Sequence, residues 1–246
     1  MLTSVRSLLA ATVLAGAAFA ATPAMAQDSE ISVSANAAIV SEYRFRGVDL
    51  SGGDIAVQGG FDLGHSSGVY VGTWASSLDE DTVGFGHTEL DVYGGWSGDV
   101  GGVTLDVGAL YYMYPNADNG LIGDTDYIEF YGSVGSTLGP ADLTVGVAYA
   151  PEQDSLGGDD NLYLYTDVGV GIPQTPLTIN GHLGYTDGFL TYTNDGDAFD
   201  WSVGASMALT ENVSVGVSYV GAEGDYLPGD YKFTDDTVVA TLSASF

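Results

Sequence analysis

The chain has 246 residues, no cysteine, and 33 Asp and Glu against 4 Lys and Arg, which gives a formal net charge of −29. This charge excludes nucleic acid as a partner, because phosphate contacts need clustered Lys and Arg. The lack of cysteine excludes a disulfide framework and thiolate chemistry. The 36 Gly and 16 Tyr suit neither a disordered acidic tail nor a helical domain.

The first 26 residues are typical of a secretory signal peptide. Arg6 supplies the positive start, Leu8–Ala20 the apolar core, and Ala24-Met25-Ala26 the cleavage site. A membrane helix is the alternative, but the apolar run is shorter than about twenty residues. We predict a signal peptide over 1–26 and a single domain over 27–246, whose net charge is −30 because 3 Lys and Arg face 33 acids.

The segment Ile31–Gly47 reads as one long strand, because apolar and polar residues alternate with a period of two. Ile31, Ile39 and Tyr43 represent its apolar side, which also includes Phe45. Its polar side carries Glu42, Arg44 and Arg46. These are the only two arginines that remain after the leader.

The same alternation recurs along the chain and predicts twelve strands in all. The eleven further segments are Ile55–Leu63, Val69–Ser77, His87–Trp96, Val103–Tyr112, Tyr127–Val134, Leu143–Tyr149, Leu162–Val170, Leu177–Tyr185, Phe199–Leu209, Val213–Tyr219 and Thr237–Phe246. Val69–Ser77 is apolar on both sides, so its facing stays open. Segments of about nine to twelve residues have the length that a tilted strand needs to cross a bilayer.

The connections alternate between short and long, as in an outer-membrane barrel with tight periplasmic turns and longer external loops. The short ones are Gly64–Gly68, Ser97–Gly102, Ser136–Pro140, Gly171–Pro176 and Thr210–Asn212. The long ones are Gly47–Asp54, Leu78–Gly86, Pro115–Thr125, Pro151–Asp160, Thr186–Asp197 and Gly221–Asp236. We therefore predict an all-β fold, a 12-stranded antiparallel transmembrane β-barrel in the cell outer membrane. A soluble β-sandwich is the competing architecture, but its polar faces would carry Lys and Glu rather than Gly, Ser, Thr and Tyr.

Aromatic residues near the ends of the segments suit the two interfacial girdles of such a barrel. They are Phe45, Trp96, Tyr111, Tyr149, Tyr185, Phe199 and Phe246. The terminal Phe246 resembles the C-terminal signal of bacterial outer-membrane barrels. Outer-membrane lipid, lipopolysaccharide and the barrel assembly machinery, the last through Phe246, are the partners that this fold implies.

Four stretches resemble the TorF-like porins of proteobacteria. They are Ser41-Glu42-Tyr43-Arg44-Phe45-Arg46-Gly47, Ala56-Val57-Gln58-Gly59-Gly60-Phe61-Asp62, Gly68-Val69-Tyr70-Val71-Gly72-Thr73-Trp74-Ala75-Ser76 and Glu89-Leu90-Asp91-Val92-Tyr93-Gly94-Gly95. The close match covers Ala35–Gly95. The resemblance implies an outer-membrane channel and names no solute.

In a closed barrel the polar side of each strand faces the lumen, so the charged residues there are the candidate site. We predict a constriction formed by Arg44, Arg46, Glu42, Glu89, Asp91 and Glu129. Fixed charges of both signs across a lumen select among ions and polar solutes. The alternative, compatible with the first, is that the arginines neutralise lumen acids and brace the barrel.

The tyrosines of the polar sides either line a path for sugars and aromatic solutes or fill the lumen and the girdles. The candidates are Tyr93, Tyr131, Tyr163 and Tyr165, with Tyr112 and Tyr127 nearby. The acidic loops suit a solvated rim better than calcium sites, because no full twelve-residue calcium loop is present. No cofactor or metal site is expected.

An enzyme is not expected either. His65-Ser66-Ser67 offers the residues of an acyl hydrolase, but it lies in a predicted periplasmic turn, and no serine partner can be assigned to His87 or His182. We predict passive diffusion of small hydrophilic solutes, with a preference for cations or neutral molecules. The alternative is a non-conducting structural or adhesive surface barrel that acts through its acidic loops.

Overall fold

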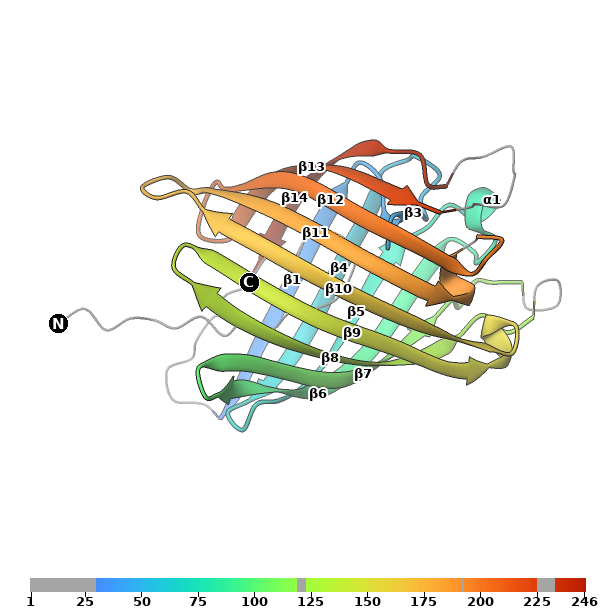
Figure 1. The fold of residues 1–246 in the computed structure, drawn as a ribbon, viewed down its shortest axis with the longest axis horizontal. Coiled ribbons are helices and arrows are strands. Elements are labelled where there is room, and N and C mark those ends of the chain that lie inside the picture. The colour runs from blue at the N-terminus through green and yellow to red at the C-terminus, as the bar shows by residue number, and fades with distance from the viewer. Residues whose placement is uncertain (1–29, 119–122, 192, 225–232) are drawn as a thin grey trace.

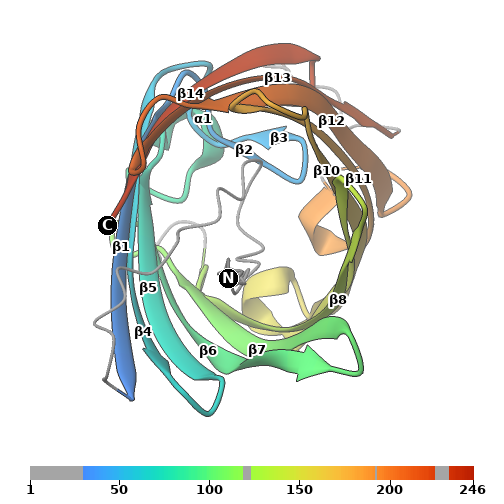
Figure 2. The same ribbon diagram turned by 90° about the vertical axis from the view of Figure 1, so that its left-hand side faces the viewer.

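The computed structural model describes residues 30–118, 123–191, 193–224 and 233–246. Within them, twelve strands form one closed antiparallel barrel in which each strand pairs with its neighbours in the chain and β1 pairs with β14 (Figures 1 and 2). The strands are β1 (Ile31–Val40), β4 (Ala56–His65), β5 (Val69–Ser77), β6 (Thr88–Val100), β7 (Val103–Met113), β8 (Tyr127–Leu138), β9 (Ala141–Gln153), β10 (Asp159–Gly171), β11 (Leu177–Gly188), β12 (Asp197–Ala208), β13 (Val213–Glu223) and β14 (Thr237–Ser245). The predicted 12-stranded barrel is confirmed, and the sandwich alternative is wrong. The predicted signal peptide lies outside the described residues.

The two ends of the barrel differ. Tight turns join the strands at one end, whereas the other end carries the long connections, with the short helix α1 (Glu80–Val83) and the 3-10 turns Asp154–Leu156 and Phe189–Thr191 (Figure 1). No helix in the described part of the chain is long and apolar enough to span a membrane. The C-terminal residue closes the seam, since Phe246 N donates to Ala35 O at 2.9 Å and Ala35 N donates to Phe246 O at 3.0 Å.

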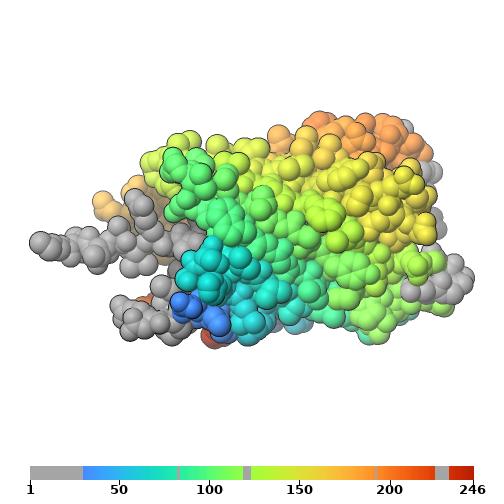
Figure 3. Space-filling model, turned by 90° about the horizontal axis from the view of Figure 1, so that it is seen from below, coloured from blue at the N-terminus to red at the C-terminus, as the bar shows by residue number. Residues whose placement is uncertain are grey.

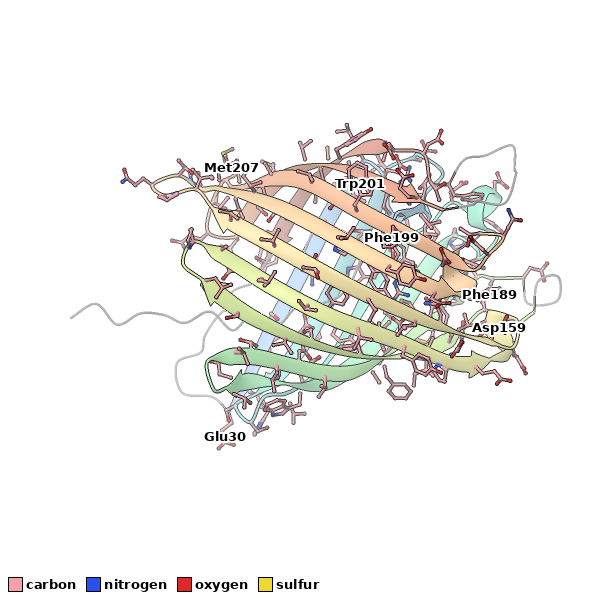
Figure 4. The ribbon with its side chains drawn as sticks, viewed as in Figure 1. Glu30, Asp159, Phe189, Phe199, Trp201 and Met207 are labelled. Atoms are coloured by element: carbon pink, nitrogen blue, oxygen red, sulfur yellow. The ribbon has the colours of Figure 1, made fainter. Side chains whose placement is uncertain are left out.

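The outer surface is apolar, as the period-two pattern predicts. On β12, Phe199, Trp201 and Met207, which are labelled in Figure 4, alternate in sequence with the inward-facing Asp200 and Ser202. Phe199 is 48% exposed, while Asp200 is 4% exposed. Figure 3 shows the same barrel wall as a continuous surface from β4 to β10. A wall with its oily side chains turned outward is suited to lipid contact.

The structure shows which side chains of β5 face outward, a question that the sequence left open. Val69 and Val71 of β5 are exposed on the outer wall, whereas Trp74 is buried on the lumen side. Tyr70 and Trp74 therefore share the inner face, and the two valines complete the apolar exterior.

The prediction of one strand over Ile31–Gly47 is wrong. The wall strand β1 ends at Val40, and the chain then turns into the lumen, where β2 (Arg44–Phe45) and β3 (Val48–Asp49) form a small hairpin (Figure 2). Tyr43 and Phe45, expected on the oily face, lie inside the barrel, and Tyr43 is 1% exposed. The alternation of apolar and polar residues did not reveal this turn, because β2 is also extended and a change in chain direction leaves the period of two intact.

Candidate functional site

The segment Ser41–Ile55, here called the plug segment, enters the barrel at the end with the long connections. Its hairpin reverses at Arg46, with φ of 50°, and Gly47, with φ of 81°. A left-handed backbone is uncommon for a residue other than glycine and concentrates at sites that the surrounding structure holds in place. Leu50 N donates to Tyr43 O at 2.9 Å and closes the hairpin.

Short-range hydrogen bonds fix the second half of the plug segment. The buried Asp49 accepts from Ser51 N at 2.8 Å and from Gly53 N at 2.7 Å. Ser51 Oγ in turn accepts from Tyr43 N at 2.8 Å. A carboxylate that accepts two backbone donors is a strong turn-former, so this part of the plug segment is held by its own sequence.

Arg44 works inside the plug segment rather than across the lumen. Its guanidinium forms an ion pair with Glu42, and its Nη1 donates to the carbonyl oxygens of Gly47 and Phe233, each at 2.9 Å. Glu42 also accepts from Thr237 Oγ1 on β14 at 3.1 Å. Both predicted site residues therefore tie the plug segment to itself and to the last strand and its preceding connection.

Arg46 reaches across the lumen. Its Nη2 lies 2.7 Å from each carboxylate oxygen of Glu129 on β8, and both side chains are 4% exposed. Glu129 also accepts from Tyr112 OH at 3.2 Å. The guanidinium carbon lies 4.2 Å from the ring centroid of Tyr163 and 4.7 Å from that of Phe45. An arginine that is paired and stacked in this way is well suited to burial.

Glu89 and Asp91 of β6 lie beneath the plug segment. Tyr43 OH donates to Glu89 Oε1 at 3.1 Å, and the Tyr43 ring meets Trp74 edge-on with centroids 5.7 Å apart. Burial holds the pKa of Tyr43 well above its ordinary value, so the phenol remains a donor. Both carboxylate oxygens of Asp91, and Oε2 of Glu89, lack a hydrogen-bond partner among the described residues.

A belt of tyrosines and acids continues around the inner wall. Tyr93 OH donates to Asp62 at 2.5 Å, and Tyr70 OH donates to Asp106 at 2.6 Å. Tyr131 OH lies 2.5 Å from Tyr70 OH. Tyr93 and Tyr131 were predicted from the sequence, whereas Asp62 and Asp106 were not, although each acid stands on the polar side of its segment.

The belt extends to β10, β11 and β12 through His182. Its Nδ1 lies 2.7 Å from Asp167 Oδ1, and its Nε2 lies 2.9 Å from Asp200 Oδ1. Tyr163 OH contacts His182 Nε2 at 2.8 Å, and the rings of Tyr163 and Tyr165 stack with centroids 5.7 Å apart. The predicted lumen tyrosines thus form a polar framework with the neighbouring acids.

The wall from β12 through β14 to β1 carries small side chains on its inner face. They are Ser202, Gly204, Ser206, Ser214, Gly216, Ser218, Thr241, Ser243, Ser34 and Asn36. Small residues on one side and a tyrosine belt on the other make the lumen asymmetric.

A closed antiparallel barrel with an apolar exterior and a charged interior is the architecture of outer-membrane β-barrels, porins among them. The chain belongs to the family described as a bacterial protein of unknown function (Gcw_chp), whose model matches residues 24–246. That family does not carry the TorF-like name, which stays a prediction. No curated protein matches the chain.

Several solved structures share the fold. A KdgM porin aligns with a TM-score of 0.55 at 8% identity, over 87% of this chain and 98% of that one. A KdgM porin in complex with disordered oligogalacturonate aligns with a TM-score of 0.56 at 6% identity, over 87% and 97%. An outer membrane channel from Pseudomonas putida F1 aligns with a TM-score of 0.51 at 12% identity, over 90% and 97%.

Proposed function

We propose that the protein is an outer-membrane channel through which small hydrophilic solutes diffuse passively, and that the plug segment forms its constriction. The observation that carries this proposal is the Arg46–Glu129 ion pair, which joins the plug segment to the opposite wall inside a closed barrel. The similar solved structures are porins and an outer membrane channel, which supports the same class. No catalytic role is proposed.

The charges of the lumen favour cations and neutral polar solutes. Arg44 is neutralised by Glu42 and Arg46 by Glu129, so neither arginine offers a free positive charge to a passing anion. The belt below adds the carboxyls of Asp62, Asp106, Asp167 and Asp200, with His182 between the last two. A lumen lined mainly by acids attracts cations and repels anions.

Conductance of the purified barrel in a planar lipid bilayer tests the proposal. We expect a small ion current from the wild-type protein and a larger one from Arg46→Ala, which removes the link to Glu129. Arg46→Lys keeps the charge but loses the two-oxygen contact, so its current should fall between them. Asp159→Asn on the exposed rim is the control and should leave the current unchanged. If neither the wild type nor Arg46→Ala carried a current, the proposal of a channel would be overturned.

The second candidate is a non-conducting surface barrel. The plug segment favours it, because buried side chains fill the lumen at the end with the long connections. Its activity would then lie in the acidic loops, and outer-membrane lipid, lipopolysaccharide and, through Phe246, the assembly machinery would be its partners. This candidate would be supported if neither the wild type nor Arg46→Ala conducted ions in a bilayer and if shortening the 78–86 loop abolished surface attachment.

A further inference from the structure

Two acids under the plug segment form no ion pair with any described residue. Glu89 is 1% exposed and Asp91 is 0% exposed. The Glu89 carboxyl has one bond, from Tyr43, and the Asp91 carboxyl has no hydrogen-bond partner among the described residues. An ionised carboxylate in such a place loses its hydration without gaining a partner, which is strongly unfavourable.

The described residues around this pair supply no second cation. The titratable and charged groups around this pair come from the plug segment, from β6, from β7 and its following connection, and from β8: Tyr43, Arg46, Tyr93, Tyr112, Tyr114, Tyr127 and Glu129. Of these, only Arg46 is positive, and it binds Glu129 through Nη2. Arg46 is therefore already paired, and neither Glu89 nor Asp91 has an ion-pair partner among the described residues.

Each of the oxygens that lack partners has less than 1 Å² of accessible surface, which leaves very little room for a metal ion or a water molecule beside it. A proton is the one cation that needs no volume. Tyr43 bonds Glu89 and packs on Trp74, and Trp74 pairs with Asp91 across β5 and β6. Removing the plug segment would therefore let water reach both carboxyls.

We propose that Glu89 and Asp91 are a proton-binding site that couples the position of the plug segment to pH. With the plug segment in place, an O–H bond keeps Asp91, and in part Glu89, neutral. When the plug segment leaves the lumen, that O–H bond breaks, the proton passes to entering water, and the carboxylate becomes hydrated. Alkaline pH therefore favours displacement, and acidic pH favours the closed position. The idea rests on the proposed function only in treating displacement as opening.

Thiol labelling tests the site without any conductance measurement. The chain has no cysteine, so Leu50→Cys places one thiol on the plug segment at a residue that is 4% exposed. Ser66→Cys, in an exposed tight turn at the other end, corrects for the pH dependence of the thiol itself. Both are made in the full-length barrel, whose folding is checked by its heat-sensitive migration in detergent gels. The readout is the ratio of their labelling rates with a water-soluble maleimide.

We expect this ratio to rise with pH by about tenfold per unit for each proton released. The double variant Glu89→Gln/Asp91→Asn cannot release these protons, so its ratio should stay flat. Asp106→Asn, a lumen acid already bonded to Tyr70, should keep the wild-type slope. If the double variant does not fold, Asp91→Asn and Glu89→Gln alone should each reduce the slope.

A flat ratio in the folded wild type from about pH 5 to about pH 9 would overturn the proposal. So would an equal rise in the wild type and in the double variant. A pH-linked ratio in a barrel that never conducts would keep the proton site and reject the channel. A conducting barrel with a flat ratio would keep the channel and reject the proton site.

Discussion

Arg46 and Glu129 are 83 positions apart in the chain, yet one nitrogen of Arg46 lies 2.7 Å from both oxygens of Glu129. The arginine stands at the reversal of the plug hairpin, and the acid stands on the far wall. This contact therefore holds the plug segment across the lumen.

Trypsin should report the position of the plug segment. It cleaves after Lys and Arg, and two of the 4 such residues in the chain are Arg44 and Arg46. Both are held inside the folded barrel, so the bonds that follow them should resist cleavage. Glu129→Gln leaves a buried guanidinium without its charge partner, a change that costs about 3–5 kcal/mol in comparable pairs. Cleavage there, followed by mass spectrometry, should accelerate at least about tenfold. Asp159→Asn should not change it, and equal rates in all three proteins would contradict the prediction.

Gly47→Ala should loosen the plug segment more than Gly84→Ala does. Both glycines have positive φ, 81° for Gly47 and 75° for Gly84. A Cβ on Gly47 would lie 2.7 Å from Ala222 Cβ, whereas one on Gly84 would meet nothing within 4 Å. Both variants carry the same backbone strain of about 1 kcal/mol, and only Gly47→Ala adds a steric clash. The same trypsin assay measures the difference, and equal susceptibility would show that the clash is relieved by movement.

Asn substitutions in the belt should lower the cation preference. Asp62→Asn and Asp106→Asn each keep an acceptor oxygen for the tyrosine but remove a negative charge from the lumen. The reversal potential in a salt gradient should move toward zero, with the larger effect at low ionic strength because salt screens fixed charges. Asp159→Asn at the rim should move it less. A shift toward stronger cation preference would reject the belt as the selective region.

Removing both arginines of the plug segment should change the same reversal potential in the other direction. Arg44→Ala/Arg46→Ala leaves Glu42 and Glu129 without their counter-charges, so the constriction gains net negative charge. We expect a stronger preference for cations in the salt gradient. An unchanged potential alongside a measurable current would place the conducting path away from these residues.

Phe246→Ala should separate assembly from stability. The Phe246 side chain is 60% exposed on the outer wall, while its backbone closes the seam with Ala35. Alanine keeps both backbone bonds, so the thermal unfolding of the barrel refolded in detergent should shift only slightly. Insertion in cells should fall several-fold if the assembly machinery reads this ring. An equal loss in both settings would instead assign Phe246 a packing role.

Much of the barrel follows from local sequence. Alternation over segments such as Phe199–Leu209 predicts which side chains face lipid, because a strand has a period of two whatever its neighbours are. The alternation of short and long connections predicts the two ends. The lumen position of Glu89, Asp91 and Glu129 follows from the same rule.

The plug segment does not follow from it. Residues 41–47 continue the period of β1, so the pattern is the same whether the chain extends the wall or folds inward. The left-handed turn at Arg46 gave no signal, because the residue has no intrinsic preference for that backbone region.

The sequence by itself determined a twelve-stranded wall, its apolar exterior and its acid-rich interior, since these depend on residue spacing along each strand. Only the tertiary structure decided that Arg46 meets Glu129, that Tyr43 covers Glu89, and that the Asp91 carboxyl has no hydrogen-bond partner among the described residues. These contacts join segments far apart in the chain. Which wall a segment reaches after turning inward depends on the shape of the whole closed barrel rather than on local periodicity.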